Sequence, residues 1–170
     1  MKFPTRLFAA LLMAVIAVSS SAGNGPENGC KPLGSWLGYD AFGSAWWMTT
    51  ADGQNASHGT LNLEVPGSVV FFPGADGVTE LRGVWEKTGA NQVAWTVVGF
   101  AYDVNKITLG LARLSGKSTF RPGCDSERLS DVFLEAFAPD ADLDIDAPIW
   151  TMPLPDHDGY RIKLVTNDLP

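Results

Sequence analysis

Few side chains in this sequence combine in the patterns that enzymes use. The chain has only two histidines, so a histidine-assisted nucleophile must involve His58 or His157. Ser57, His58 and Asp52 are the residue types of a hydrolytic triad. However, adjacent strand residues point to opposite faces, and no Gly-x-Ser-x-Gly segment exposes a nucleophile. We therefore predict no catalytic residue and expect no covalent catalysis.

Carboxylates gather in two segments that could bind a cation. His157 lies between Asp156 and Asp158 in a Pro-Asp-His-Asp-Gly segment, which is typical of a surface turn. The acidic segment 140–146 has an aspartate at every second position, as a calcium loop does. It lacks the glycine at the sixth position and the glutamate at the twelfth that an EF-hand requires. We expect a solvated acidic loop, and we predict neither a metal site nor a cofactor.

Aromatic residues are the most prominent candidates for binding. The chain has 6 Trp, 9 Phe and 3 Tyr. In a β-barrel, inward aromatic side chains either fill the interior or line an apolar pocket for a lipid, an isoprenoid or an aromatic metabolite. Eight strands is about the size at which both outcomes occur. The residues that we expect to contact such a ligand are Trp47, Trp85, Trp95, Phe100 and Tyr102.

The elements that must position these residues are short strands separated by turns. Polar and apolar residues alternate with period two from 60 to 65, and Pro66-Gly67 interrupts the pattern. Residues 88–91 contain the Gly and Asn that a hairpin connection needs. The segment 125–131 is the one that is compatible with a short helical turn, since Asp125 is of a type that caps helices. The predicted strands are a first one around Gly34 to Trp36, then 44–50, 60–65, 68–72, 79–87, 92–102, 106–116, 131–138 and 160–165.

This succession of short strands and turns predicts an all-β domain, an antiparallel up-and-down β-barrel of about eight strands. From 93 to 100 both strand faces are largely apolar or small, which favours a closed apolar interior. Gly83, Gly99 and Gly110 lie inside predicted strands, where they suit a strongly curved sheet. A β-sandwich is the alternative.

The sequence Gly34-Ser35-Trp36 at the first predicted strand resembles the Gly-x-Trp signature that opens lipocalins and related calycin barrels. The segment 83–89, followed by 95–103, is also similar to exported bacterial proteins with a lipocalin-like barrel. The resemblance implies that Trp36 closes one barrel end and that a late arginine, Arg161, packs on its ring in a structural role. The chain departs from the family in lacking a Thr-Asp-Tyr motif and a recognisable C-terminal helix.

The N-terminus indicates export. Lys2 and Arg6 precede an apolar run of eleven residues, Phe8 to Val18, and small residues follow up to Ala22. We predict a signal peptide over 1–22, an N-terminal extension over 23–33 and one barrel domain over 34–170. The apolar run is too short to span a bilayer as a helix, so we expect no integral membrane association. Polar residues precede Cys30, so we expect a periplasmic or secreted protein that is not a lipoprotein.

Two further observations bound the partners and the redox state. The only cysteines are Cys30 and Cys124, and in an exported chain they predict one disulfide. The chain has 12 Lys and Arg and 19 Asp and Glu, which gives a net charge of -7. This sign opposes binding to a phosphate backbone, so we expect no nucleic-acid partner.

These features favour an exported protein that holds a small hydrophobic ligand in the barrel cavity. One alternative is an isomerase or cyclase on the same scaffold, with Asp40, Tyr39, Tyr102 or Asp103 as its acid or base. Another is an envelope interaction module whose barrel is filled. The first alternative needs an ionisable group inside the cavity, whereas the second needs a filled interior and an exposed aromatic patch.

Overall fold

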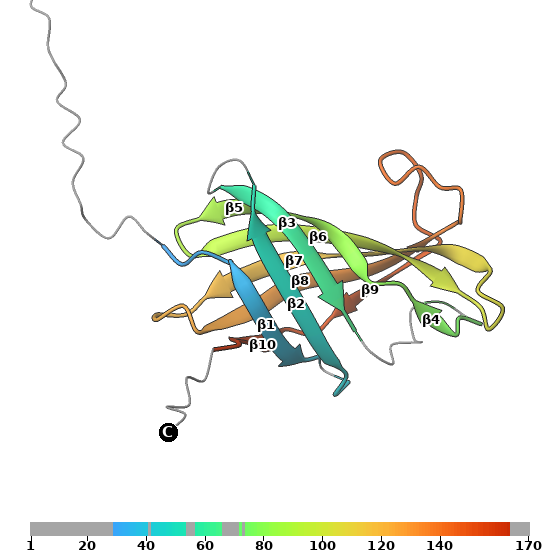
Figure 1. The fold of residues 1–170 in the computed structure, drawn as a ribbon. Helices are drawn as coiled ribbons and strands as arrows, with labels where there is room; N and C mark the ends of the chain where they lie inside the picture. Colours follow the sequence, from blue (N-terminus) through green and yellow to red (C-terminus); the bar gives the residue numbers. More distant parts are fainter. Residues whose placement is uncertain (1–28, 41, 54–56, 66–71, 73, 164–170) are drawn as a thin grey trace, which may run out of the picture.

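The computed structural model describes residues 29–40, 42–53, 57–65, 72 and 74–163, and these residues form only strands, turns and irregular segments. None of them forms a helix, and so none forms one able to cross a membrane. The segment 1–22 and most of the strand expected at 68–72 lie outside the described residues. The strands (Figure 1) are β1 (Gly34–Tyr39), β2 (Ala45–Asp52), β3 (His58–Glu64), β4 (Gly77–Val78), β5 (Leu81–Gly89), β6 (Gln92–Tyr102), β7 (Thr108–Phe120), β8 (Ser126–Phe137), β9 (Trp150–Leu154) and β10 (His157–Arg161).

Eight of the described strands close into an antiparallel barrel in the order β1-β2-β3-β5-β6-β7-β8-β10. The circle closes because β10 pairs on both sides: Arg161 lies opposite Trp36 of β1, and Tyr160 lies opposite Ser126 of β8. Each of the other neighbours in the circle is joined by an antiparallel ladder. The predicted all-β barrel is therefore confirmed, and the sandwich alternative is wrong.

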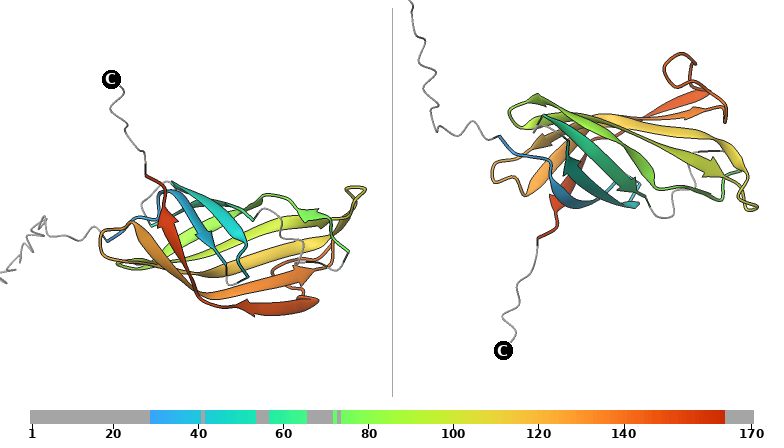
Figure 2. Two further views of the ribbon diagram at one scale, coloured as in Figure 1. Left: turned by 90° about the horizontal axis from the view of Figure 1, so that it is seen from below. Right: turned by 45° about the horizontal axis from the view of Figure 1, so that its top comes forward.

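Two short strands lie outside the circle and extend the sheet. β4 pairs with the end of β6, and β9 pairs with the second half of β8. Figure 2 shows β6, β7 and β8 continuing past the barrel, where they form a flap together with these two strands. β9 was not predicted from the sequence. It contains Pro153, which disfavours a central strand but is tolerated at a sheet edge.

Residues 125–131 do not form the helical turn that the sequence allows, because Ser126 to Asp131 belong to β8. The first part of β8 is hydrogen-bonded to β7 on one side and to β10 on the other. Ladder pairing on both sides outweighs the local preference for a turn. Farther along, Asp131 has a φ of 51°, and the register with β7 shifts between Ser115 and Lys117, which marks a β-bulge.

The bulge changes which residues of β8 face inward. Before it, Glu127 and Leu129 are buried, whereas after it Val132 and Leu134 are buried. The inward face therefore moves from odd-numbered to even-numbered residues. The rest of the interior is packed with apolar side chains from the other strands, chiefly Trp36, Trp46, Met48, Leu61, Leu63, Leu81, Trp85, Val93, Trp95, Val97, Leu114 and Phe120.

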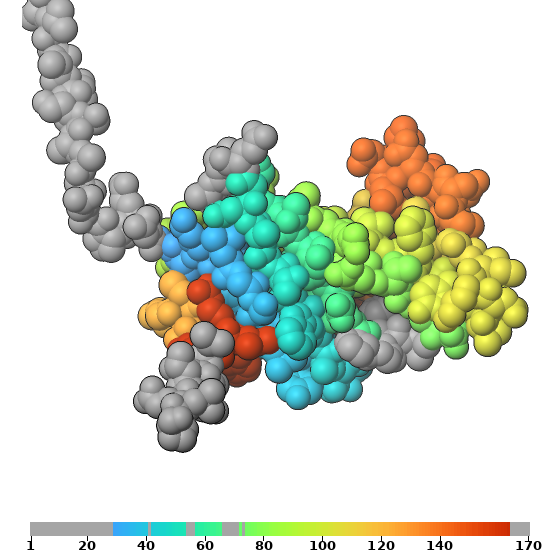
Figure 3. Space-filling model, in the orientation of Figure 1, coloured from blue at the N-terminus to red at the C-terminus, as the bar shows by residue number. Residues whose placement is uncertain are grey.

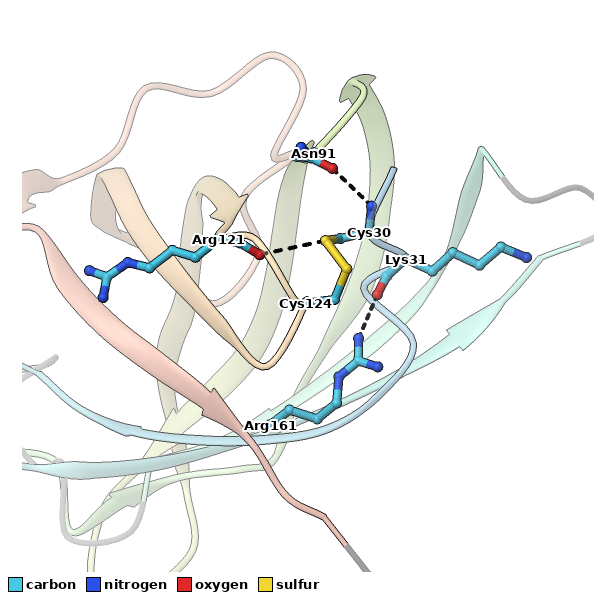
Figure 4. Close-up of a disulfide and its surroundings, with 6 residues drawn as sticks. All are labelled: Cys30, Lys31, Asn91, Arg121, Cys124 and Arg161. Carbon is cyan, nitrogen blue, oxygen red and sulfur yellow. Dashed lines mark hydrogen bonds between the residues drawn. A yellow bond between two sulfur atoms is a disulfide. The ribbon is translucent and has the colours of Figure 1, made fainter. Parts of the chain in front are cut away.

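One end of the barrel is covered by the segment that precedes β1, and a disulfide holds this segment in place. Cys30 and Cys124 are bonded, as the sequence predicts. Figure 4 shows the N–H of Cys30 donating to Oδ1 of Asn91, at 2.9 Å, in the β5–β6 turn. The disulfide therefore joins the start of the barrel to the β7–β8 turn, and it indicates a non-reducing, extracellular-type environment.

Trp36 fills the same end of the barrel. It is fully buried, its indole N–H donates to the carbonyl of Pro32 at 2.7 Å, and its ring lies 5.4 Å from that of Phe120. The guanidinium of Arg161 lies 4.7 Å from the Trp36 ring centroid and donates to the carbonyl of Lys31 at 2.7 Å (Figure 4). The contact that the resemblance implies between Arg161 and Trp36 is thus present.

Candidate functional site

The opposite end of the barrel contains an apolar pocket, which we call the mouth pocket. It encloses about 450 Å³ of empty space, including open solvent at its entrance, and about 30 Å³ of this admits the centre of a water molecule. Asp40 and His157 are its ionisable lining residues. The mouth pocket is lined by Asp40, Trp46, Met48, Leu63, Val65, Trp95, Leu114, Leu129, Val132, Leu154 and His157.

Trp46 forms one wall of the mouth pocket because two glycines leave room for its ring. Gly38 and Gly159 lie opposite each other on β1 and β10. A Cβ on Gly38 would lie 2.3 Å from Cζ2 of Trp46, and one on Gly159 would lie 2.5 Å from Cη2. The ring of His157 packs edge-on against Trp46, at 6.0 Å between centroids. The buried Nε1 of Trp46 has no acceptor among the described residues.

A second space lies deeper in the barrel, toward Trp36, and we call it the inner chamber. It holds about 200 Å³ of empty space, open solvent included, of which about 10 Å³ admits the centre of a water molecule. This is close to the minimum that one water needs. Met48 and Trp95 border both spaces. The inner chamber is lined by Pro32, Met48, Thr50, Leu61, Trp85, Val93, Trp95, Ser118 and Glu127.

The inner chamber contains the two buried polar side chains of the described core, Ser118 and Glu127. Ser118 Oγ accepts the indole N–H of Trp95 at 3.1 Å. Glu127 is 0% exposed, and neither of its carboxylate oxygens has a hydrogen-bond partner among the described residues.

Burial raises the pKa of the Glu127 carboxyl from its ordinary value of 4.5 to about 7. The nearby Ser118 hydroxyl and the positive charge of Arg161 oppose this rise but do not cancel it. Glu127 therefore titrates near neutral pH inside an apolar barrel. Such a group can accept or donate a hydrogen bond, depending on its protonation state.

The five aromatic residues proposed from the sequence do not gather in one place. Trp85 and Trp95 are buried in the interior and line the inner chamber. Trp47 and Phe100 are 48% and 50% exposed on the outer face of the sheet. Tyr102 lies at the end of β6, where the ammonium of Lys106 sits 4.2 Å from its ring centroid.

The acid or base groups considered for an isomerase have other roles in the structure. Oδ1 of Asp40 accepts the N–H groups of Phe42 and Ser44, and so shapes the β1–β2 turn at the pocket rim. Oδ1 of Asp103 does the same in the turn after β6. Tyr39 is 62% exposed on the outer face of β1. Among the described residues, the ionisable side chain that is fully buried in the barrel is Glu127 instead.

The structure also places the two candidate cation segments. The acidic loop 140–146 projects from the body of the molecule (Figure 3, orange). Its Asp142 and Asp146 carboxylates accept N–H groups of the same loop. In the other segment, His157 packs against Trp46, and the carboxylates of Asp156 and Asp158 form ion pairs with Arg128. His58, the histidine considered for a triad, is exposed opposite Glu86. Within the described part of the chain, no three His, Cys, Asp or Glu side chains are grouped to hold a metal ion.

Sequence reasoning missed Trp46, Met48 and Glu127. Adjacent strand residues such as Trp46 and Trp47 point to opposite faces, but the sequence alone did not show which of them faces inward. Glu127 alternates with Leu129, and this is the signal that could have placed it inside a barrel. That signal was missed because the strand was predicted to begin only at residue 131.

The barrel has two features that the resemblance to lipocalins implies. It is a closed antiparallel barrel of eight strands, and Trp36 lies beneath Arg161 at one end. Comparisons of the chain with protein-family models, curated proteins and solved structures gave no match. The barrel is thus an observation, whereas kinship with lipocalins is part of the proposal that follows.

Proposed function

We propose that this protein is an exported, lipocalin-like barrel that binds a small hydrophobic molecule in its mouth pocket. The observation that carries the proposal is the pocket lining, which is apolar except at Asp40 and His157. An open barrel end lined in this way removes apolar ligand surface from water. The closed barrel, the Trp36–Arg161 contact and the disulfide support the lipocalin-like and exported character.

Entry of a ligand requires side chains to move. The interior is nearly filled, since only about 30 Å³ of the mouth pocket admits the centre of a water molecule. Met48 is suited to such movement, because its unbranched thioether chain has several rotatable bonds. The indole N–H of Trp46, which is buried without an acceptor among the described residues, can donate to a polar atom of the ligand.

Adjacent tryptophans provide a direct test of this site. Trp46 is 4% exposed in the pocket wall, whereas Trp47 is 48% exposed on the outer face. We expect fatty acids, isoprenoids or aromatic probes to change the tryptophan fluorescence of the wild type and of Trp47→Phe. In Trp46→Phe the change should be largely lost. An unchanged fluorescence with every probe, or a response that depends on Trp47 instead, would contradict the proposal.

A second candidate function is docking to another protein through the outer face. Tyr160, Leu37 and Trp47 lie side by side in register across β10, β1 and β2, with exposures of 56%, 37% and 48%. We call these three exposed side chains the outer apolar row. A photo-crosslinking residue at position 47 tests this function, with exposed position 84 on β5 as the control. A discrete adduct from position 47 alone supports docking, and equal results from both positions oppose it.

A further inference from the structure

We propose that the inner chamber is the polar end of the ligand site and that Glu127 there binds a hydroxyl group carried by an otherwise apolar molecule. The inference rests on the proposed function, because it names the class of molecule that the barrel takes, an apolar alcohol or phenol. Three observations support it: the burial of Glu127, the lining that the two spaces share and the charges around the carboxyl.

The stability of the fold alone does not explain why a carboxyl is buried at position 127. The Glu127 side chain is fully buried, with the Ser118 hydroxyl and the charge of Arg161 nearby. Even so, neither carboxylate oxygen has a hydrogen-bond partner of standard geometry among the described residues. A buried polar group without partners costs free energy that an apolar side chain would not. An unpartnered carboxyl that lines a cavity is explained if a bound molecule supplies the missing donor.

The mouth pocket and the inner chamber are neighbouring parts of one interior. Met48 and Trp95 line both of them, so these two side chains form the partition. Gly159 gives a second link. A Cβ there would lie 2.5 Å from Cη2 of Trp46 and 2.9 Å from Oε1 of Glu127. The pocket wall and the carboxyl thus meet at one glycine, and a chain that displaces Met48 from the mouth side reaches Glu127.

The size and charge of the inner chamber favour a hydroxyl over a charged group. About 10 Å³ admits the centre of a water molecule, which suits a group the size of a hydroxyl. The charge of Arg161 acts on Glu127, so an ammonium would bring a second cation. A carboxylate would place two acids together. A neutral hydroxyl donates to the carboxyl, and its oxygen can accept from a neighbouring donor such as Ser118.

The test compares four probes that share one alkyl chain: 1-octanol, 1-methoxyoctane, octylamine and octanoate. Binding to the disulfide-bonded protein is measured by titration calorimetry. We expect 1-octanol to bind about tenfold more tightly than 1-methoxyoctane, which cannot donate a hydrogen bond, and more tightly than either charged probe. In Glu127→Leu this preference should disappear, and in Glu127→Gln it should persist in part because the amide oxygen still accepts.

Controls separate this inference from the function on which it rests. Glu86→Leu removes an exposed carboxyl from the outer face of β5 and should leave the preference unchanged. We expect Glu127→Leu to fold, since it replaces an unpartnered buried acid with an apolar side chain. Equal binding of 1-octanol and 1-methoxyoctane, or a preference that survives in Glu127→Leu, overturns the inference alone. Failure of all four probes to bind also counts against the proposed function.

Discussion

At the scale of single residues, the buried polar groups of this barrel differ in their hydrogen bonding. Trp36, Trp85 and Trp95 all direct their indole N–H groups to protein oxygens. Glu127 has no such partner among the described residues and is 0% exposed. The free energy of unfolding should therefore depend strongly on the protonation of this residue.

We expect Glu127 to make the protein less stable as the pH rises from about 4.5 to 7. The unfolded chain releases this proton near pH 4.5, whereas the folded chain keeps it up to about pH 7. The folded state is thus favoured most at low pH, and the loss approaches about 3 kcal/mol above pH 7. Urea unfolding at pH 4.5 and pH 8 measures this loss of unfolding free energy. Glu127→Gln should lack this decrease, and an equal pH dependence in both proteins contradicts the assignment.

Trp36 should contribute more to stability than any exposed tryptophan. It is fully buried, accepts the Arg161 cation on its ring and donates to Pro32. Trp36→Ala is expected to lower the free energy of unfolding by about 3 to 5 kcal/mol. Trp47→Ala, on the outer face, should cost much less in the same denaturant titration. A loss below about 1 kcal/mol for Trp36→Ala would remove this residue from its role in closing the barrel.

At the scale of strands, close contacts between neighbouring elements decide which glycines are needed. Gly159 on β10 lies between Trp46 of β2 and Glu127 of β8. Gly159→Ala should destabilise the barrel by about 1 to 3 kcal/mol because the added methyl overlaps both side chains. Gly89 is the control, since a Cβ there meets its nearest atom at 3.5 Å. Equal melting temperatures for the two alanine variants would contradict this packing.

The sequence predicts elements well where turn chemistry and alternation agree. The connection at 88–91 joins β5 to β6, and β6 has the predicted bounds. Local patterns could not predict the bulge at Asp131, which moves the inward face of β8 by one residue. Glu127, which precedes the bulge, was missed because the strand was predicted to begin only at residue 131, whereas β8 begins at Ser126. Trp47 was chosen over Trp46 because only the pairing of Gly38 with Gly159 shows where an indole ring fits.

At the scale of the whole molecule, a disulfide ties the start of the first barrel strand to a turn two-thirds of the way along the chain. The two cysteines are 94 residues apart in sequence. Closing so long a loop in the unfolded chain is worth about 4 to 5 kcal/mol in the chain-entropy account. Cys30→Ser with Cys124→Ser should therefore lower the unfolding free energy by about 2 to 5 kcal/mol. Two free thiols in the protein purified from its own host, detected by alkylation and mass spectrometry, would contradict this role.

The central claim concerns the whole barrel, which we propose to hold a small hydrophobic molecule. Native mass spectrometry of the protein purified from its own host tests it most directly, followed by release and identification of whatever is bound. We predict one adduct per chain, an apolar molecule, and the further inference specifies that it carries a hydroxyl group. A mass equal to that of the bare, disulfide-bonded chain in every preparation would contradict the claim.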